Sequence, residues 1–178
     1  MINFALQTTL ACALALLFAN AGAHKLRDRL RFSAQLAEYR LLPASFVTVA
    51  ATLLGIVEMA ISVALILPAT REAAGLAAAS LLVGYAIAIG INLVRGRSYI
   101  DCGCGDSPQM LSGWLLVRNA LLACGALTMT LNASAASFSW ADLAVAIPAF
   151  IVICGVYLTA EQILENASAL REWRELSD

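Results

Sequence analysis

Five long apolar stretches constrain the fold of this chain more than any other feature of its sequence. A helix needs about 20 apolar residues to cross the hydrocarbon core of a bilayer. Hydrophobic residues make up 61% of the 178 residues and charged residues only 13%, against about 45–50% and about 25% in soluble domains. We therefore predict an all-α, polytopic membrane helix bundle forming a single domain, 1–178. Its five predicted spans are residues 4–23, 44–67, 73–94, 110–131 and 140–160.

The first stretch, Phe4–Ala23, could also be a secretory signal, because Ala21-Gly22-Ala23 has the small residues of a cleavage site. A signal peptide carries its positive charges before the apolar run. Here Lys25 and the arginines follow it. We expect this segment to be retained as a helix.

Basic residues fall almost entirely on one side of the predicted membrane. With five spans, the first and third connections and the C-terminal tail share one side, and that side carries more Lys and Arg, which indicates the cytoplasm. We expect an outside N-terminus, a cytoplasmic C-terminus and a cytoplasmic connection at residues 95–109. The residues on this side are Lys25, Arg27, Arg29, Arg31, Arg40, Arg95, Arg97, Arg171 and Arg174, against Arg71 on the other.

The basic first connection should include a short amphipathic helix within residues 24–40. Its apolar side chains, Leu26, Leu30, Leu36 and Tyr39, would face lipid or the bundle at the membrane interface. The sequence has no basic patch with interleaved aromatic residues of the kind that binds nucleic acid.

The connection at 95–109 carries the pattern with the clearest chemistry, Asp101-Cys102-Gly103-Cys104-Gly105. Disulfides require a specific geometry, and the flanking glycines let the backbone bend enough to join cysteines two positions apart. Such a bond would be strained and easily reduced, which suits exchange better than a structural role. Cys102 and Cys104 are therefore the predicted catalytic pair.

Two other readings of this loop remain open. A structural zinc site needs about four ligands, and Asp101, Cys102, Cys104 and Asp106 would form a poor one; we predict no metal. The two cysteines could also be incidental residues of a glycine-rich turn. Nearby arginines would favour a thiolate and the aspartates would oppose it.

The remaining cysteines, Cys12, Cys124 and Cys154, lie inside predicted spans, where cysteine commonly behaves as a small hydrophobe. Cys12 and Cys124 would lie at similar depth in the outer half of the membrane. They could form a second pair that relays electrons from the loop to the outer face.

Ionisable groups inside spans are costly and usually face the bundle interior. Glu58 and Arg118 are such groups near mid-span, so we expect an ion pair between the second and fourth spans. A proton-transfer or quinone-linked role for Glu58 is the alternative. Asn92 and Asn119 are expected to form hydrogen bonds between helices.

Together these features resemble the methylamine utilisation protein MauE family. The resemblance rests on Asp101-Cys102-Gly103-Cys104 after a third span, on five spans and on chain length. The first half is also similar to the wider DoxX-like group, which implies a four-helix core plus one helix. That similarity rests on Gly22 with Lys25-Leu26, on Leu42-Pro43 and on Glu58.

The MauE resemblance implies a bacterial inner-membrane factor that matures methylamine dehydrogenase. That periplasmic enzyme's small (beta) subunit would be the client, and a periplasmic thioredoxin-like, MauD-like protein would exchange electrons with Cys102 and Cys104. A periplasmic partner favours an external loop, whereas the charge distribution places the loop inside, so a transmembrane relay would be needed.

Three functions therefore compete on sequence grounds. The first is a thiol–disulfide oxidoreductase that acts through Cys102 and Cys104, with Asp101, Gly103, Glu58 and Arg118 in supporting positions. The second is a non-enzymatic membrane scaffold or transport component. The third is a quinone-linked oxidoreductase with Glu58 and Arg118 near the quinone head group.

Overall fold

The structure, a computed structural model, describes residues 4–103 and 109–131, and, further along, 144, 147–152, 155, 157, 159, 162–163 and 166. Its regular elements are helices, which confirms the all-α prediction for this part of the chain. They are α1 (Phe4–Arg27), α2 (Arg29–Glu38), α3 (Ala44–Ile66), α4 (Arg71–Val94) and α5 (Gly113–Leu127), followed by a 3-10 turn, η1 (Thr128–Thr130).

Four helices of the described chain, α1, α3, α4 and α5 with η1, are long and apolar enough to cross a membrane. They correspond to the first four predicted spans. The main difference is at the end of α1, which continues to Arg27 instead of stopping near Ala23, so Lys25 lies inside a helix. The fifth predicted span, 140–160, falls on a stretch of which only scattered residues are described.

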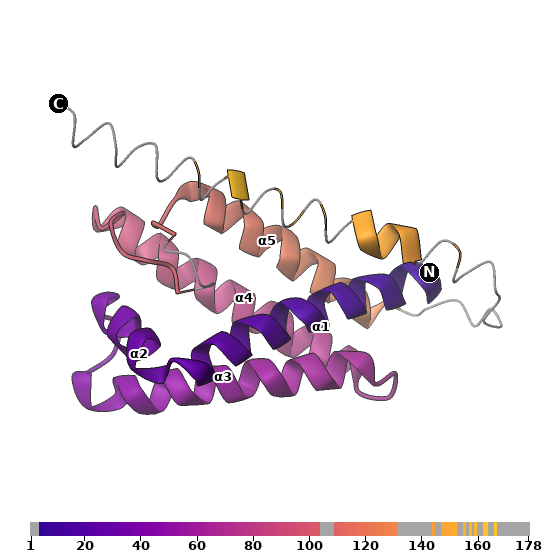
Figure 1. Cartoon of the computed structure of the whole chain (residues 1–178), viewed down its shortest axis with the longest axis horizontal. Coiled ribbons are helices and arrows are strands. Elements are labelled where there is room, and N and C mark those ends of the chain that lie inside the picture. The colour runs from indigo at the N-terminus through magenta and orange to yellow at the C-terminus, as the bar shows by residue number, and fades with distance from the viewer. Residues whose placement is uncertain are drawn as a thin grey trace.

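The four long helices run back and forth along the molecule, each antiparallel to the one before it (Figure 1). The end of α1, the start of α3, the end of α4 and the start of α5 therefore meet at one end of the bundle. We call this the loop end; it also holds α2 and the connection between α4 and α5. The predicted amphipathic helix within 24–40 is thus confirmed as α2.

Sequence signals account for the helix boundaries at the loop end. Asp28 caps α2, and its side chain accepts a hydrogen bond from the Arg31 backbone N–H at 3.1 Å, as N-cap aspartates commonly do. Pro43 is the N-cap of α3, because its ring fixes φ and it needs no hydrogen-bond partner for a backbone N–H.

Small residues let the helices approach closely in the core. Ala11, Ala78 and Ala126 are fully buried beside Phe18 and Leu65. Without a hydrophobic force between helices in lipid, close van der Waals packing of this kind drives association.

The outer surface is apolar, as expected for a lipid-facing bundle. Large side chains such as Leu53, Val63 and Ile87 are exposed, whereas Glu58 and Asn92 are buried. These two polar side chains therefore face the interior of the bundle, as is usual in membrane helices.

Candidate functional site

Asp101 organises the cysteine loop through its carboxylate. Its Oδ1 accepts hydrogen bonds from the backbone N–H groups of Gly103, at 3.2 Å, and Gln109, at 3.1 Å. Its Oδ2 accepts one from Gln35 Nε2 of α2 at 2.6 Å. The two sides of the loop also pair directly, since Cys102 N–H donates to the Gln109 carbonyl at 2.8 Å. One carboxylate thus joins both sides of the loop to α2.

Gly103 occupies a position that only glycine fits easily. Its φ is +68°, in the left-handed region that L-residues rarely adopt. A Cβ at this position would lie 3.1 Å from Phe32 Cε2 and 3.2 Å from Gln35 Oε1. The loop backbone can therefore lie directly on α2.

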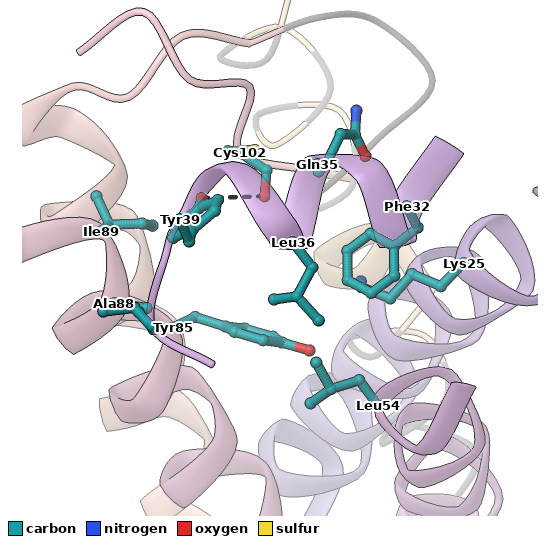
Figure 2. Close-up of a pocket in the computed structure, with 12 residues that line it drawn as sticks. Lys25, Phe32, Gln35, Leu36, Tyr39, Leu54, Tyr85, Ala88, Ile89 and Cys102 are labelled. Carbon is teal, nitrogen blue, oxygen red and sulfur yellow. Dashed lines mark hydrogen bonds between the residues drawn. The ribbon is translucent and has the colours of Figure 1, made fainter. Parts of the chain in front are cut away.

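Cys102, next to Gly103 in this loop, is only 9% exposed. Its carbonyl accepts a hydrogen bond from the Tyr39 hydroxyl at 3.4 Å, as Figure 2 shows. Its thiol donates to Gln109 Oε1, with 3.6 Å between sulfur and oxygen. Ile100 and Leu111 pack around it. Cys104, its predicted partner, lies outside the described residues.

A buried charged cluster lies deeper in the bundle. Lys25 Nζ of α1 is 2.9 Å from Glu58 Oε1 of α3, and both side chains are at most 4% exposed. The Tyr85 hydroxyl of α4 donates to the same oxygen at 2.7 Å. The Lys25 ammonium also lies 5.1 Å from the centre of the Phe32 ring and 5.6 Å from that of Tyr85, within cation–π range.

A close helix crossing explains why Lys25 and Glu58 meet. A Cβ on Gly22 would lie 2.9 Å from the Gly55 carbonyl oxygen, and a Cβ on Gly55 would lie 2.9 Å from Leu26 Cγ. The two glycines therefore bring the α1 and α3 backbones together one turn from the ion pair. Gly22, Lys25, Leu26 and Glu58, which carry the DoxX-like resemblance, meet at this crossing.

The predicted ion pair between Glu58 and Arg118 is wrong. Glu58 instead pairs with Lys25, because α1 packs closely on α3, whereas α5, which carries Arg118, packs mainly on α4. The prediction failed because Lys25 was assigned to a loop, while α1 in fact extends past it.

A cavity of about 60 Å³ separates the cysteine loop from the charged cluster. Cys102, Gly103 and the inner face of α2 line it together with Lys25 and Tyr85. Figure 2 shows Lys25 beside Phe32 of α2, with Cys102 and Tyr85 on opposite sides of Leu36. Aliphatic side chains such as Leu36, Leu54 and Ile89 fill most of the remaining wall. Cys102 and Lys25 thus border the same space.

Glu58 and Arg118 do share a second cavity, of about 70 Å³, on the other side of the cluster. Asn20, Asn119 and Tyr157 add further polar groups to its wall, which also includes apolar side chains such as Phe18 and Leu82. Four of its lining residues, Leu17, Asn20, Leu122 and Tyr157, also line an apolar groove of about 490 Å³, whose other walls come from α1, α5 and Phe150. Arg118 is therefore near Glu58 without being its ion-pair partner.

The asparagine prediction also needs correction. Asn92 donates to the Ala88 carbonyl at 3.1 Å and Asn119 to the Leu115 carbonyl at 2.9 Å. Both bonds lie within one helix, four residues back, where a buried amide finds an acceptor without a neighbouring helix.

The predicted second cysteine pair, Cys12 and Cys124, does not form a disulfide in this structure. Cys12 is half-buried on α1, Cys124 is exposed on α5, and neither forms a disulfide. Cys154 falls outside the described residues. Among the described residues no three His, Cys, Asp or Glu side chains gather to hold a metal ion; Cys104 and Asp106 are not among them.

Sequence reasoning missed several site residues, among them Phe32, Gln35, Tyr85 and Gln109. Gln35 and Gln109 are buried polar residues in or beside the loop end, and sequence alone gives no partner for either. Tyr85 offered a weak signal, because it is a polar-tipped aromatic residue in the middle of an otherwise apolar span.

Comparison with known proteins is consistent with this arrangement. The family described as methylamine utilisation protein MauE matches residues 3–132. A methylamine utilization protein MauE of Paracoccus denitrificans is 37% identical over 142 residues, covering 76% of each chain. The one from Paracoccus versutus is 36% identical over 166 residues, covering 92% of this chain and 87% of its own.

A third relative, methylamine utilization protein MauE of Methylorubrum extorquens, is 42% identical over 116 residues, covering 64% of this chain and 62% of its own. No solved structure matches the chain significantly. The family match includes the α1–α3 crossing, the charged cluster and the cysteine loop, since all of them lie within residues 3–132. The chain therefore belongs to the methylamine utilisation protein MauE family, and it is a multi-pass membrane protein of the methylamine utilisation system.

Proposed function

We propose that this protein is a thiol–disulfide exchange factor that helps to mature the small (beta) subunit of methylamine dehydrogenase. Cys102 and Cys104 would alternate between a dithiol and a disulfide. In the oxidising direction, the disulfide accepts two electrons from a dithiol of a thioredoxin-like partner, whose two thiols become a disulfide while Cys102 and Cys104 become thiols.

The observation that carries this proposal is the construction of the loop around Cys102. A cysteine without a function in a turn would not require a fixed loop backbone. Here Asp101 joins both sides of the loop by hydrogen bonds, and Gly103 packs against Phe32. The Tyr39 hydroxyl then binds the Cys102 carbonyl. The structure thus holds Cys102 in a defined position, as expected for one member of an exchanging pair.

The protein would act in the bacterial inner membrane, with its N-terminus outside and its C-terminus in the cytoplasm. The support is the excess of basic residues at the loop end, where Arg27, Arg29, Arg40 and Arg95 are exposed. Because the client and the thioredoxin-like partner would be periplasmic, electrons would have to cross the membrane. Cys12 and Cys124 are candidates for that relay, and full activity of their serine variants would exclude it.

A double substitution, Cys102→Ser with Cys104→Ser, tests the proposal in cells that grow on methylamine. We expect the small subunit to accumulate with incomplete disulfides, measured by thiol alkylation and mass spectrometry. The variant must reach the membrane in normal amount, which immunoblotting checks. Complete disulfides in that strain would support a scaffold or transport role instead.

A quinone-linked oxidoreductase is the second candidate, and a specific observation favours it. The cavity lined by Glu58 and Arg118 shares lining residues with the large apolar groove that α1, α5, Phe150 and Tyr157 line. A pocket that contains charged and polar groups, beside an apolar groove, suits a ring with a hydrocarbon tail. Organic extraction of the purified protein, followed by chromatography, would find a stoichiometric quinone if this candidate is right and none if it is wrong.

A further inference from the structure

The Cys102 thiol lies inside the loop end and not on its surface. The residue is 9% exposed and packs with Ile100, Leu111 and Leu115. Its sulfur donates a buried hydrogen bond to Gln109 Oε1, and Gln109 is itself only 7% exposed. Cysteines that react with partners in solution are partially exposed, whereas buried cysteines are generally inert.

The backbone around Cys102 is held as well, so the thiol cannot turn outwards on its own. The Cys102 N–H donates to the Gln109 carbonyl at 2.8 Å, and the Cys102 carbonyl accepts a hydrogen bond from the Tyr39 hydroxyl (Figure 2). The backbone N–H of the next residue, Gly103, donates to the Asp101 carboxylate. Exposure of the sulfur would require several of these hydrogen bonds to break together.

Exchange with another protein depends on access to a sulfur. A thiolate of the partner must reach one of the two sulfurs of a disulfide, and the reaction passes through a mixed disulfide between the two proteins. A sulfur carried by a second protein cannot reach a thiol that these side chains enclose. Cys104 belongs to the same chain, two residues further on, so its bond with Cys102 needs no access from the surface.

We propose that Cys102 is the inner thiol of the pair, which does not bond to the partner, and that Cys104 forms the mixed disulfide. This inference rests on the proposed function, because it assigns the order of steps within the same exchange. In the oxidising direction, a thiolate of the partner attacks the Cys104 sulfur. The bond between Cys104 and Cys102 breaks, and Cys102 leaves with the electron pair.

The second step completes the transfer of two electrons. The other thiolate of the partner attacks the partner's own sulfur in the mixed disulfide, which releases Cys104 and leaves the partner as a disulfide. The two protons lost by the thiols of the partner end on Cys102 and Cys104.

The structure shows Cys102 in the state that the first step produces. Cys102 is a free thiol and donates to Gln109 Oε1. The Gln109 backbone N–H donates to Asp101 Oδ1 at 3.1 Å, so the same carboxylate that joins the loop also holds this acceptor. The reduced Cys102 can therefore remain buried with its S–H group hydrogen-bonded.

Two single-cysteine chains of the purified full-length protein, in detergent micelles, test this assignment. Both carry Ser at positions 12, 124 and 154; Cys104→Ser then leaves Cys102 alone, and Cys102→Ser leaves Cys104 alone. The probe is a bacterial thioredoxin that lacks its resolving cysteine and carries thionitrobenzoate on its remaining cysteine. Formation of the mixed disulfide is measured by the absorbance of the released thionitrobenzoate. We expect Cys104 to react roughly tenfold faster than Cys102, or more.

A matched pair of variants tests whether the folded loop is what protects Cys102. In the chain without Cys104, Asp101→Ala removes the carboxylate that joins both sides of the loop and should raise the Cys102 rate severalfold. Glu72→Ala removes an exposed carboxylate at the start of α4, at the opposite end of the bundle, and should leave Cys102 slow. Thermal unfolding checks that each chain is folded, and a second pair of chains, with Cys104→Ala and Cys102→Ala, should give the same order of rates.

The assignment is overturned if Cys102 reacts as fast as Cys104 in the folded chains, or if neither reacts. It is also overturned if Asp101→Ala leaves Cys102 as slow as before. The proposed function fails on a different observation, the absence of a disulfide between Cys102 and Cys104 in cells. A redox-active pair with a fast Cys102 would therefore refute only the order of steps.

Discussion

At the scale of single residues, the buried ion pair between Lys25 and Glu58 is the strongest constraint in the site. Both charges are out of contact with solvent, and Tyr85 adds a hydrogen bond to the shared oxygen. Removing one member of a buried pair leaves the other uncompensated, whereas removing both together is far less costly.

Lys25→Met should therefore destabilise the protein by about 3–5 kcal/mol, because Glu58 would stay buried without its ion-pair partner. Tyr85→Phe should cost less, about 1.5–3 kcal/mol, since it removes one hydrogen bond to a charged group. Denaturant unfolding of the purified protein in detergent micelles measures both. The double variant Lys25→Met with Glu58→Met should recover much of the loss; equal instability of the single and double variants would contradict a direct pair.

Gly103 and Gly96 allow a second, matched comparison. Both have positive φ, +68° and +73°, but a Cβ on Gly96 would meet nothing within 4 Å. Gly96→Ala should cost about 1 kcal/mol from backbone conformation alone. Gly103→Ala adds a clash with Phe32 and should also lift the loop from α2, so that Cys102 reacts severalfold faster with a small maleimide. Equal alkylation rates in the two variants would show that the Phe32 contact does not hold the loop.

At the scale of helices, the crossing of α1 and α3 determines whether the charged cluster can form. Gly22→Ala would place a Cβ 2.9 Å from a backbone oxygen that cannot rotate away. We expect a loss of about 1–3 kcal/mol, seen as a lower Tm in a thermal unfolding assay.

Gly84→Ala on α4 is the control for this substitution, because its Cβ would meet nothing within 4 Å. It should be neutral or stabilising by up to about 1 kcal/mol. If both variants have the same Tm as wild type, the close approach of α1 and α3 is not needed for stability.

The helices were easier to predict than the contacts between them. Hydropathy marks a span because each residue contributes to it independently, so the four spans of the described chain were located to within a few residues. The partner of Glu58 depends on which helices are neighbours, and hydropathy carries no such information. The loop was predicted as a cysteine site, but the roles of Gln35 and Tyr39 required the position of α2, which only the folded chain provides.

At the scale of the whole molecule, orientation in the membrane decides which compartment the cysteine loop meets. Cys102 is buried, so its own labelling would report packing as well as sidedness. Exposed positions at the two ends of the bundle are better reporters. Tyr99 lies at the loop end and Ala69 lies in the turn between α3 and α4 at the opposite end.

Single cysteines at these positions, Tyr99→Cys and Ala69→Cys in a chain without other cysteines, should label with opposite sidedness. An impermeant maleimide added from the periplasmic side should react with Ala69→Cys only, and Tyr99→Cys should react in inverted membrane vesicles. The reverse pattern would place the cysteine loop in the periplasm and remove the need for a transmembrane relay.

The central claim is that Cys102 and Cys104 form a reversible redox pair, and their oxidation state in cells tests it most directly. Cells growing on methylamine are quenched with acid, and the thiols of the isolated protein are alkylated with N-ethylmaleimide before peptide mass spectrometry. We predict two forms of the peptide that contains Cys102 and Cys104. In the oxidised form a disulfide joins the two cysteines, which take up two maleimides only after dithiothreitol treatment. In the reduced form both cysteines carry a maleimide without that treatment. If both cysteines are fully alkylated even without prior reduction in every sample from growing cells, they are not a redox pair and the proposed function is wrong.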